Sequence, residues 1–291
     1  MQILNIGSIN IDHVYRVGHF VQPGETLGSA DYRTFAGGKG YNQSVALARA
    51  GATVRHAGRV GPHAEWLLER LRNEGVDTTC LQVGEVPTGH AIIQVVPSGE
   101  NAIVLYGGAN QCVGEADVDA ALSSCSEGDC LLLQNETSAV AYAIRAAHER
   151  KLRVVFNPAP MSSAVRGYPL DRVDVFILNE TEALELTGAN DPDEIGVRMR
   201  RQYPRAATVL TLGARGAVWV DSGVLHRQPA LRVKAVDTTA AGDTFIGFFL
   251  AAWVQTGDPR LALERGCRAA ALCVTRAGAA DSIPRREELD I

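Results

Sequence analysis

The stretch at positions 236–253 reads VDTTAAGDTFIGFFLAAW and joins a loop of small residues to an apolar segment. After its single carboxylate, Asp243, almost every side chain is apolar. This pattern predicts a buried helix over residues 240–256. A glycine inside a helix costs about 1 kcal/mol relative to alanine, so Gly242 needs a reason beyond helix formation.

The predicted start of this helix has the properties of an anion-binding site. Thr238 or Thr239 can cap the helix, which leaves the backbone N–H groups of residues 240–243 unpaired. No bulky side chain screens them, so a phosphate can reach these groups and the positive end of the helix dipole. Asp243 would repel a phosphate unless it takes a proton from an incoming hydroxyl; otherwise it only complements the dipole, worth about 0.3–1 kcal/mol. We therefore favour phosphoryl transfer to an alcohol.

The bulk composition narrows the class of protein. The chain has 291 residues, 46% of them hydrophobic and 21% charged, which is ordinary for a folded globular chain, and we expect one α/β domain over residues 1–291. A net charge of −5 provides no basic field for nucleic acid. No apolar run approaches the roughly 20 residues of a membrane span, and the start lacks a secretory signal. Six cysteines form no Cys-x-x-Cys pair, so we expect reduced thiols in a cytoplasmic protein rather than a zinc site.

Short apolar runs alternate with helical patterns along most of the chain. This alternation predicts a doubly wound, mostly parallel central sheet that is flanked by helices. The predicted strands cover residues 3–8, 53–60, 130–133, 153–157, 175–179 and 208–212. The predicted helices cover residues 39–51, 63–74, 138–150, 180–187, 191–203, 240–256 and 258–275.

Two segments break this rhythm. Residues 11–36 and 86–106 alternate apolar and polar residues around Pro-Gly and Ser-Gly turns, which is typical of β-hairpins. We expect the two segments to pair into one small antiparallel sheet that projects from the main domain. Such a sheet would serve as a lid, as a dimerisation surface, or as both.

Polar side chains follow four of the predicted strands. In open α/β sheets, ligands bind beyond the carboxyl ends of the strands, so these side chains predict a shared cleft. They are Asn10 and Asp12, then Gln134, Asn135 and Glu136, then Asn157, and finally Asn179 and Glu182. A cleft with several carboxylates and amides suits a polyhydroxylated ligand and a metal-bound phosphate.

A second loop-to-helix junction lies in the segment TFAGGKGYNQ. Its glycines let the backbone approach a ligand closely, and Lys39 and Asn42 supply donors. The alternative is a flexible turn with a solvated lysine. The segment is neither a phosphate loop nor a dinucleotide fingerprint, and neither pattern occurs elsewhere in the chain, which argues against a nicotinamide-dependent oxidoreductase.

Nine motifs carry a family resemblance. In chain order they read GSINIDH, PGET, FAGGKGYNQS, GGAN, FNPAP, LNETEALELTG, TLGARGA, VDTTAAGDTF and VTRAGAADSIP. With them the chain resembles the ribokinase (PfkB-type) sugar kinase family over essentially its whole length. The resemblance implies a ribokinase-like fold, in which the two hairpin segments form a lid over the sugar and commonly a homodimer interface.

The resemblance also implies roles for individual positions. The residues that would bind the sugar hydroxyls are Asn10, Asp12, Gly38, Lys39, Asn42 and Glu136. Those that would perform the chemistry are the base Asp243 and the anion-hole N–H groups of Ala240, Ala241 and Gly242. Those that would organise Mg²⁺ and ATP are Asn179, Glu182, Thr211, Gly213 and Gly216. Those that resemble a K⁺ site are Asp237, the carbonyl of Thr239 and Ser282.

The activity implied is an ATP-dependent transfer of the γ-phosphoryl group to the primary hydroxyl of a pentose, with D-ribose at O5 favoured. Alternatives are a kinase of deoxyribose or a ketose, and a nucleoside kinase. A nucleoside needs room for its base, which Tyr41 and Tyr106 could supply by stacking, although packing in the lid is the simpler role for both. A non-catalytic sugar-binding regulator is disfavoured because the chain keeps Asp243 and Gly242.

Overall fold

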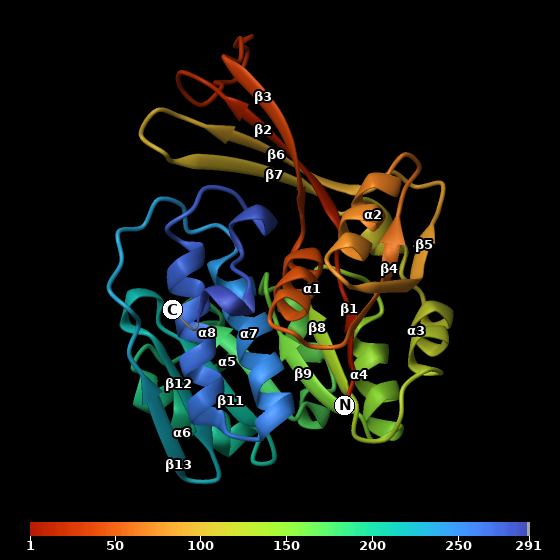
Figure 1. Cartoon of the computed structure of the whole chain (residues 1–291), viewed down its shortest axis with the longest axis vertical. Helices are drawn as coiled ribbons and strands as arrows, with labels where there is room; N and C mark the ends of the chain where they lie inside the picture. Colours follow the sequence, from red (N-terminus) through yellow and green to blue (C-terminus); the bar gives the residue numbers. More distant parts are fainter. Residues whose placement is uncertain (290–291) are drawn as a thin grey trace.

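A computed structural model describes residues 1–289 of the chain and contains a large and a small β-sheet (Figure 1). The large sheet has the strand order β13-β12-β11-β10-β9-β8-β1-β4-β5. Its strands are β1 (Ile3–Ile6), β4 (Val54–Val60), β5 (Asp77–Val83), β8 (Cys130–Gln134), β9 (Arg153–Asn157), β10 (Val175–Asn179), β11 (Ala207–Thr211), β12 (Ala217–Asp221) and β13 (Val224–Gln228). All neighbouring strands are parallel except the β11–β12 and β12–β13 pairs, which confirms a mostly parallel central sheet.

Helices cover both faces of this sheet, as expected for a doubly wound fold. One face packs against α1 (Lys39–Arg49), α2 (Glu65–Asn73), α7 (Ala241–Thr256) and α8 (Pro259–Cys273). The other packs against α3 (Glu115–Leu122), α4 (Val140–Glu149), α5 (Glu180–Thr187) and α6 (Pro192–Gln202). Short 3₁₀ turns complete the chain: η1 (Gly108–Cys112), η2 (Ser163–Gly167), η3 (Leu170–Arg172), η4 (Gly213–Arg215), η5 (Ala280–Ser282) and η6 (Arg286–Glu288). Within residues 1–289, no helix is long and apolar enough to cross a bilayer.

The predicted strands and helices are all present, with ends shifted by a few residues. The sequence patterns missed β5, α3 and the β12–β13 hairpin. Strand β5 is an edge strand with a mixed burial pattern, so it lacks the continuous apolar run that marks the inner strands. The hairpin turns at Ser222 and Gly223, both with positive φ, and adds an antiparallel edge to the sheet.

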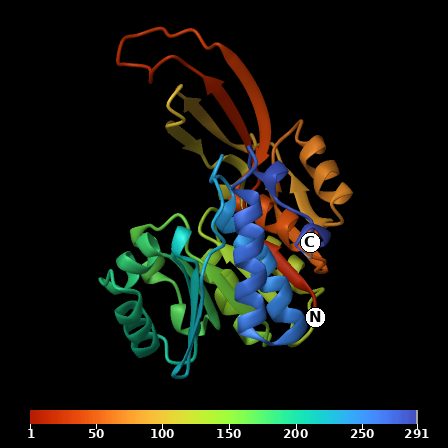
Figure 2. The same cartoon turned by 60° about the vertical axis from the view of Figure 1, so that its left-hand side comes forward.

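The small sheet combines two hairpins in the order β3-β2-β6-β7. Its strands are β2 (Asn10–Arg16), β3 (Asp31–Gly37), β6 (Gly89–Val95) and β7 (Asn101–Tyr106). The expectation of an antiparallel sheet was wrong: each hairpin is antiparallel, but β2 and β6 pair in parallel, so the sheet is mixed. The first strand of each hairpin, β2 or β6, leaves the main body at the same edge, where Asn10 pairs with Gly89. The two strands therefore run in the same direction. Figures 1 and 2 show this sheet projecting from the main body.

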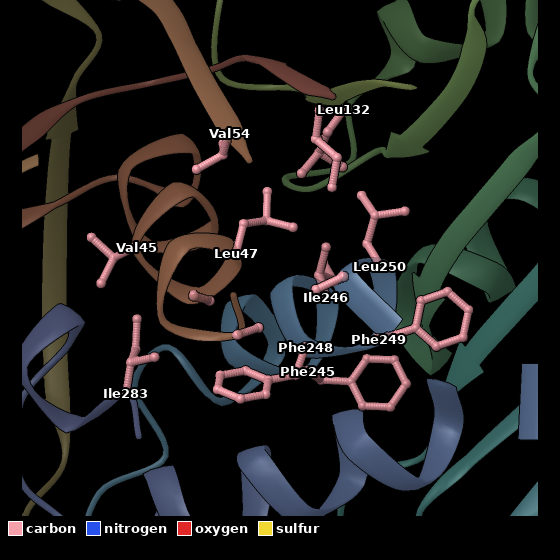
Figure 3. Packing of buried hydrophobic residues seen from close by; sticks show 14 of the residues in the cluster. Val45, Leu47, Val54, Leu132, Phe245, Ile246, Phe248, Phe249, Leu250 and Ile283 are labelled. Atoms are coloured by element: carbon pink, nitrogen blue, oxygen red, sulfur yellow. The ribbon is translucent and has the colours of Figure 1, made fainter. Parts of the chain in front are cut away.

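Two glycines place α1 against both β1 and α7. A Cβ at Gly40 would lie 2.4 Å from the backbone nitrogen of Ser8, and one at Gly247 would lie 2.3 Å from the Cβ of Ala46. Glycine at position 40 therefore lets the first turn of α1 pack against the backbone that follows β1, and glycine at position 247 lets α7 approach α1 closely. Behind this contact, apolar side chains of both helices share one core, which Figure 3 shows around Leu47 and Phe248.

Replacing Gly247 by alanine tests this close packing. We expect Gly247→Ala to lower the free energy of unfolding by about 1–3 kcal/mol, because the added methyl must push two packed helices apart. Thermal and urea denaturation measure the change. Gly167→Ala is the control, because a Cβ there meets nothing within 4 Å and φ is not in the left-handed region. A wild-type melting temperature for Gly247→Ala would contradict this packing arrangement.

Candidate active site

Two neighbouring cavities open at the carboxyl ends of the central strands. The order in which strands are added to the sheet changes direction at β1, which has β4 on one side and β8 on the other. Such a change of direction is where open α/β sheets bind their ligands. The first, of 270 Å³, lies between the small sheet and the main sheet and is lined by Asn10, Leu105, Gly107, Asn110, Gln111, Asn135, Glu136 and Pro160. The second, of 230 Å³, lies at the start of α7 and is lined by Lys39, Asn157, Ala159, Ile177, Leu178, Asn179, Glu182, Thr211, Thr238, Ala240, Ala241, Gly242, Asp243 and Ile246.

Glu136 and Lys39 connect the two cavities. The backbone N–H of Lys39 donates to Oε2 of Glu136 at 3.0 Å, and the hydroxyl of Ser8 donates to the same oxygen. Gly38, just before α1, has φ 91°, a left-handed conformation that turns the chain into this contact. Within residues 1–289, both of these donors contact Oε2, so Oε1 of Glu136 can accept a hydrogen bond from a ligand in the first cavity.

Asn10 and Asp12 approach the first cavity from β2. The side-chain oxygen of Asn10 accepts a hydrogen bond of 2.7 Å from Asn110, which is itself anchored by the N–H of Ile9 at 2.9 Å. Asp12 shares a sheet face with Leu105, which lines the cavity, because both lie opposite Ala91 in the strand register. Burial, and secondly the charge of Glu136, raise the pKa of Asp12 to about 6. The pair of carboxylates suits the binding of several hydroxyl donors.

Asp243 lies buried in the first turn of α7, against the first turn of α1. Its Oδ1 accepts a hydrogen bond of 2.9 Å from Nε2 of Gln43, and its Oδ2 accepts one of 3.0 Å from Nδ2 of Asn42. Burial raises the pKa of Asp243, while the charge of Lys39 and these two donors oppose the rise. Because its carboxylate borders the second cavity, it is placed to accept a proton there.

Lys39 is a half-buried cation among three carboxylates. Burial lowers its pKa, but the charges of Asp243, Glu136 and Glu182 outweigh this effect, so the pKa lies above its usual value. A permanently charged ammonium group in the second cavity favours an anion there. Lys39 therefore connects the two cavities electrostatically as well as through its backbone.

The start of α7 differs in two details from the prediction. Neither Thr238 nor Thr239 caps the helix through its side chain: the N-cap is Ala240, and the N–H of Thr239 donates to Asp237 instead. The N–H of Ala241 also is not free, because it donates to the carbonyl of Thr238 at 3.3 Å. Both follow from the left-handed φ of 59° at Ala240, which folds the preceding residues tightly over the helix start.

The other N–H groups of this helix start remain available. Within residues 1–289, those of Ala240, Gly242 and Asp243 donate to no protein acceptor. A Cβ added to Gly242 would meet nothing within 4 Å, so the glycine keeps this approach open to a ligand. The long bond of Ala241 is one that an incoming anion can displace.

Asn179 and Glu182 border the second cavity from the β10–α5 junction. They form a reciprocal capping box, in which each side chain accepts the other's backbone N–H at 2.9 Å. Nδ2 of Asn179 also donates to Oε1 of Glu182 at 2.9 Å. Burial raises the pKa of Glu182 in spite of the Asn179 N–H and the charge of Lys39. Since both carboxylate oxygens already accept protein bonds, a metal ion would be met most simply through water.

The end of β11 and the turn after it contain the three residues expected at the nucleotide. Thr211 lines the second cavity and donates its hydroxyl to the carbonyl of Leu178 at 3.2 Å. Gly213 and Gly216 lie in the following turn with φ of 54° and 100°, outside the lining of both cavities. A Cβ at Gly216 would lie 2.0 Å from the carbonyl oxygen of Gln228, so packing alone already requires this glycine.

The Thr239 carbonyl and the Ser282 hydroxyl both contact the thiol of Cys273, and Asp237 is bonded to the backbone of Thr239. The carboxylate of Asp237 accepts the N–H groups of Thr239 at 2.9 Å and Gly278 at 3.0 Å. Sγ of Cys273 lies 3.7 Å from the Thr239 carbonyl oxygen and 3.1 Å from the hydroxyl of Ser282. A carboxylate, a carbonyl and a hydroxyl are the hard oxygen donors that an alkali cation prefers, so the donor set fits a K⁺ ion.

The aromatic candidates for stacking a base lie elsewhere. Tyr41 is 1% exposed and belongs to the apolar core between α1 and its neighbours. Tyr106 lies opposite His90 in the small sheet, on the face away from Asp12. Its ring packs against the His90 ring, with 5.0 Å between the two ring centroids. Neither residue lines either cavity.

Sequence reasoning overlooked several residues of the site. Gln43 holds Asp243, Asn110 holds Asn10, and Ser8 holds Glu136. Each lies inside one of the nine motifs, and Gln43 and Ser8 also lie next to or near a predicted ligand residue. The signal was therefore present, but the partners are distant in sequence and only the fold shows that they meet.

The family assignment follows from comparison with known proteins. The family model described as pfkB family carbohydrate kinase matches residues 2–286, so the chain belongs to this family. It is accordingly a phosphotransferase that acts on sugar hydroxyls.

Three relatives illustrate the range of similarity. The chain is 40% identical to a ribokinase of Haemophilus influenzae, over 97% of this chain and 95% of the relative. It is 32% identical to a deoxyribokinase of Salmonella typhimurium, over 100% and 98% of the two chains. The solved structure of Arabidopsis thaliana ribokinase complexed with ribose and ATP superimposes with a TM-score of 0.89 at 27% identity, over 99% and 97% of the two chains.

Proposed function

We propose that the chain is an ATP-dependent kinase that phosphorylates the primary hydroxyl of a pentose, with D-ribose, phosphorylated at O5, as the favoured substrate. The observation that carries this proposal is the position of Asp243. In the second cavity, its buried carboxylate lies beside a helix start whose N–H groups face the same space, and the first cavity, with its amide and carboxylate side chains, is directly adjacent.

The sugar would occupy the first cavity, between the small sheet and β8. Asn10, Asp12 and Glu136 would accept or donate hydrogen bonds to its hydroxyls, together with Gly38, Lys39 and Asn42 at the start of α1. The side-chain oxygen of Asn42 supports this assignment, because it is buried and has no protein partner within the described chain. Held in this way, the sugar presents its primary hydroxyl between the two cavities.

Asp243 would act as the general base. It takes the proton of the primary hydroxyl as that oxygen attacks the γ-phosphorus of ATP, and the bond from this phosphorus to the bridging oxygen of ADP breaks. The N–H groups of Ala240, Ala241 and Gly242 would stabilise the charge on the transferred phosphoryl oxygens. Lys39 would add a fixed positive charge on the same side.

The nucleotide and its ions would lie along the second cavity. Thr211, Gly213 and Gly216 would border the nucleotide, and Asn179 and Glu182 would hold the water shell of a Mg²⁺ ion. When bound, Mg²⁺ neutralises phosphate charge. Asp237, the carbonyl of Thr239 and Ser282 would bind K⁺ and so stiffen the loop that precedes the anion hole. The Arabidopsis relative, which was solved in complex with both ribose and ATP, supports a site for two ligands.

The choice of sugar rests on similarity and on the cavity. Ribokinases and a deoxyribokinase are both among the relatives, so deoxyribose is the second candidate. The first cavity, at 270 Å³, is lined by amide and carboxylate side chains together with Leu105 and Pro160, and neither Tyr41 nor Tyr106 lines it. This arrangement favours a free sugar over a nucleoside.

We further propose that residues 1–291 form a single kinase domain in which residues 11–36 and 86–106 serve as the lid and as the surface of a homodimer. Tyr32, Ile92 and Val104 support the second role, because they are exposed on the face of the small sheet that lies away from Asp12. Sedimentation velocity tests the assembly. A monomer at micromolar concentration would contradict it.

The substrate panel tests the proposed function. ADP release from ATP and Mg²⁺ is measured with ribose, deoxyribose, fructose and a set of nucleosides, each in potassium or sodium buffer. We expect the highest kcat/KM with ribose and faster turnover in potassium. Preferential turnover of a nucleoside would contradict the sugar assignment. Sugar binding by calorimetry without any turnover would favour a non-catalytic regulator.

The raised pKa of Asp12 predicts a pH dependence of sugar binding. Below about pH 6 Asp12 is protonated, so it loses the charge that attracts the sugar hydroxyls, and we expect KM for the sugar to rise as the pH falls through about 6. Initial rates at saturating ATP and varied sugar, between pH 5 and 8, give KM at each pH and so measure this acid limb of the KM–pH profile. The same limb should be absent from Asp12→Asn, and its persistence there would assign it to another group.

A further inference from the structure

Behind Asp243 lies a chain of buried amide side chains that the proposed reaction does not use. Gln43 and Asn5 are 0% exposed, Gln134 is 1% exposed, and Asn157 is 6% exposed. They come from α1, β1, β8 and β9, so the chain of amides spans the centre of the sheet. Burying four amides is costly unless their donors and acceptors are matched. Within residues 1–289, Oε1 of Gln134 is the one side-chain atom of the four that is buried without a partner, and the other bonds set which way each amide turns.

One end of this chain is anchored on a backbone carbonyl. Nδ2 of Asn5 donates to the carbonyl oxygen of Gly40 at 2.8 Å, and a carbonyl oxygen can only accept. The oxygen of Asn5 must therefore point the other way, where it accepts a bond of 3.0 Å from Nε2 of Gln134. The same nitrogen donates to Oε1 of Gln43 at 2.7 Å.

The orientation of the Gln43 amide follows from these bonds. With its oxygen held by Gln134, Gln43 must turn its NH₂ group toward α7 and β9. There Nε2 donates to Oδ1 of Asp243 at 2.9 Å and reaches Oδ1 of Asn157 at 3.3 Å. Asn157 is anchored in turn, because its Nδ2 donates to the carbonyl oxygen of Ile177 at 3.0 Å. Backbone carbonyls at both ends thus fix the direction of every amide between them.

We propose that Gln43 is the positioning residue for Asp243, and that Gln134 sets the polarity of Gln43 so that only its NH₂ group can face the carboxylate. The inference rests on the proposed role of Asp243 as base. The NH₂ group of Gln43 holds Oδ1, and Asn42 holds Oδ2, so the carboxylate keeps one orientation and both donors favour its ionised form.

The charged neighbours of Asp243 do not fix the orientation of its carboxylate, whereas Gln43 and Asn42 do. Lys39 on α1 attracts the ionised form electrostatically, whereas Glu182 on α5 repels it. Within residues 1–289, the hydrogen bonds to the Asp243 carboxylate come from the amides of Asn42 and Gln43. A lysine charge at longer range cannot fix the rotation of the carboxylate; directional hydrogen bonds can.

The test compares Gln43→Met, which removes the donor at similar volume, with Gln43→Glu, which places a second carboxylate against Asp243. For both we expect kcat to fall about 100-fold while KM for the sugar stays within roughly twofold. We also expect the acid limb of the kcat–pH profile to move to higher pH. Thr208→Val is the control: it alters an equally buried polar residue in β11, away from both cavities, and should leave rate and profile unchanged.

A readout that does not depend on turnover completes the test. In protein labelled with ¹³C at aspartate carboxyl groups, Asp243 is assigned by its absence from Asp243→Asn, and its pKa should be higher in Gln43→Met than in the wild type. Should that variant fail to fold, Gln134→Met replaces it: Gln43 is then free to rotate, and we expect a smaller loss of kcat with the same direction of the pKa change.

The outcomes separate this inference from the proposed function. An unchanged Asp243 pKa and an unchanged profile in Gln43→Met would overturn the positioning role, even if kcat fell through lost stability. A wild-type protein without turnover of any sugar would defeat the proposed function, while the NMR titration would still decide whether Gln43 controls Asp243.

Discussion

Asp243→Asn should bind the sugar with nearly wild-type affinity and lose turnover by a factor of about 10²–10⁴. Asparagine has the shape of aspartate but cannot accept the hydroxyl proton. It also offers one oxygen where the wild type offers two, so either Asn42 or Gln43 loses its acceptor. Isothermal titration with the sugar and a coupled assay of ADP release measure the two quantities separately.

Two comparisons sharpen this result. The melting temperature of Asp243→Asn shows whether the lost acceptor has disturbed the fold, because a lost rate in a well-folded variant then reflects chemistry. Turnover within a few-fold of the wild type would mean that another group takes the proton, and the assignment of the base would be wrong.

Gly242→Leu should leave the fold intact and reduce turnover by about 100-fold or more. An added Cβ meets nothing within 4 Å in the protein, and leucine favours a helix over glycine by up to about 1 kcal/mol, so the melting temperature should not fall. The longer side chain would nevertheless extend into the second cavity, where the transferred phosphoryl group must reach the helix start.

The matched control is Gln255→Leu, an exposed substitution in the last turn of the same helix. It adds a similar apolar surface without approaching either cavity and should keep the wild-type kcat and KM. If Gly242→Leu also kept the wild-type kcat, the phosphoryl group could not be bound at this helix start, and the anion-hole proposal would fail.

The central fold could be predicted from local patterns because its strands are buried on both faces. Runs such as β8 and β10 are continuously apolar, and the helices between them have clear apolar faces. Strand β5 escaped prediction because an edge strand is half exposed. The pairing of β2 with β6 also escaped, because no local signal states whether two distant hairpins meet in parallel or antiparallel.

The ligand residues of the candidate site could be named from motifs, but their supports could not. Glu136, Asn42 and Asp243 each carry a chemical group that stands out in the sequence. Gln43 and Gln134 look like ordinary polar residues until the fold brings α1, β8 and α7 together. The left-handed turn at Ala240 was likewise invisible, since alanine normally avoids positive φ.

Proton-coupled ³¹P NMR of the product formed from ATP and D-ribose tests the proposed reaction most directly. Transfer to the primary hydroxyl places phosphorus next to a CH₂ group, so we predict a new phosphate ester whose signal is split into a triplet, together with an equal amount of ADP. A doublet would place the phosphate on a ring carbon and contradict the proposed orientation of the sugar. Inorganic phosphate alone, or no consumption of ATP, would contradict the kinase reaction itself.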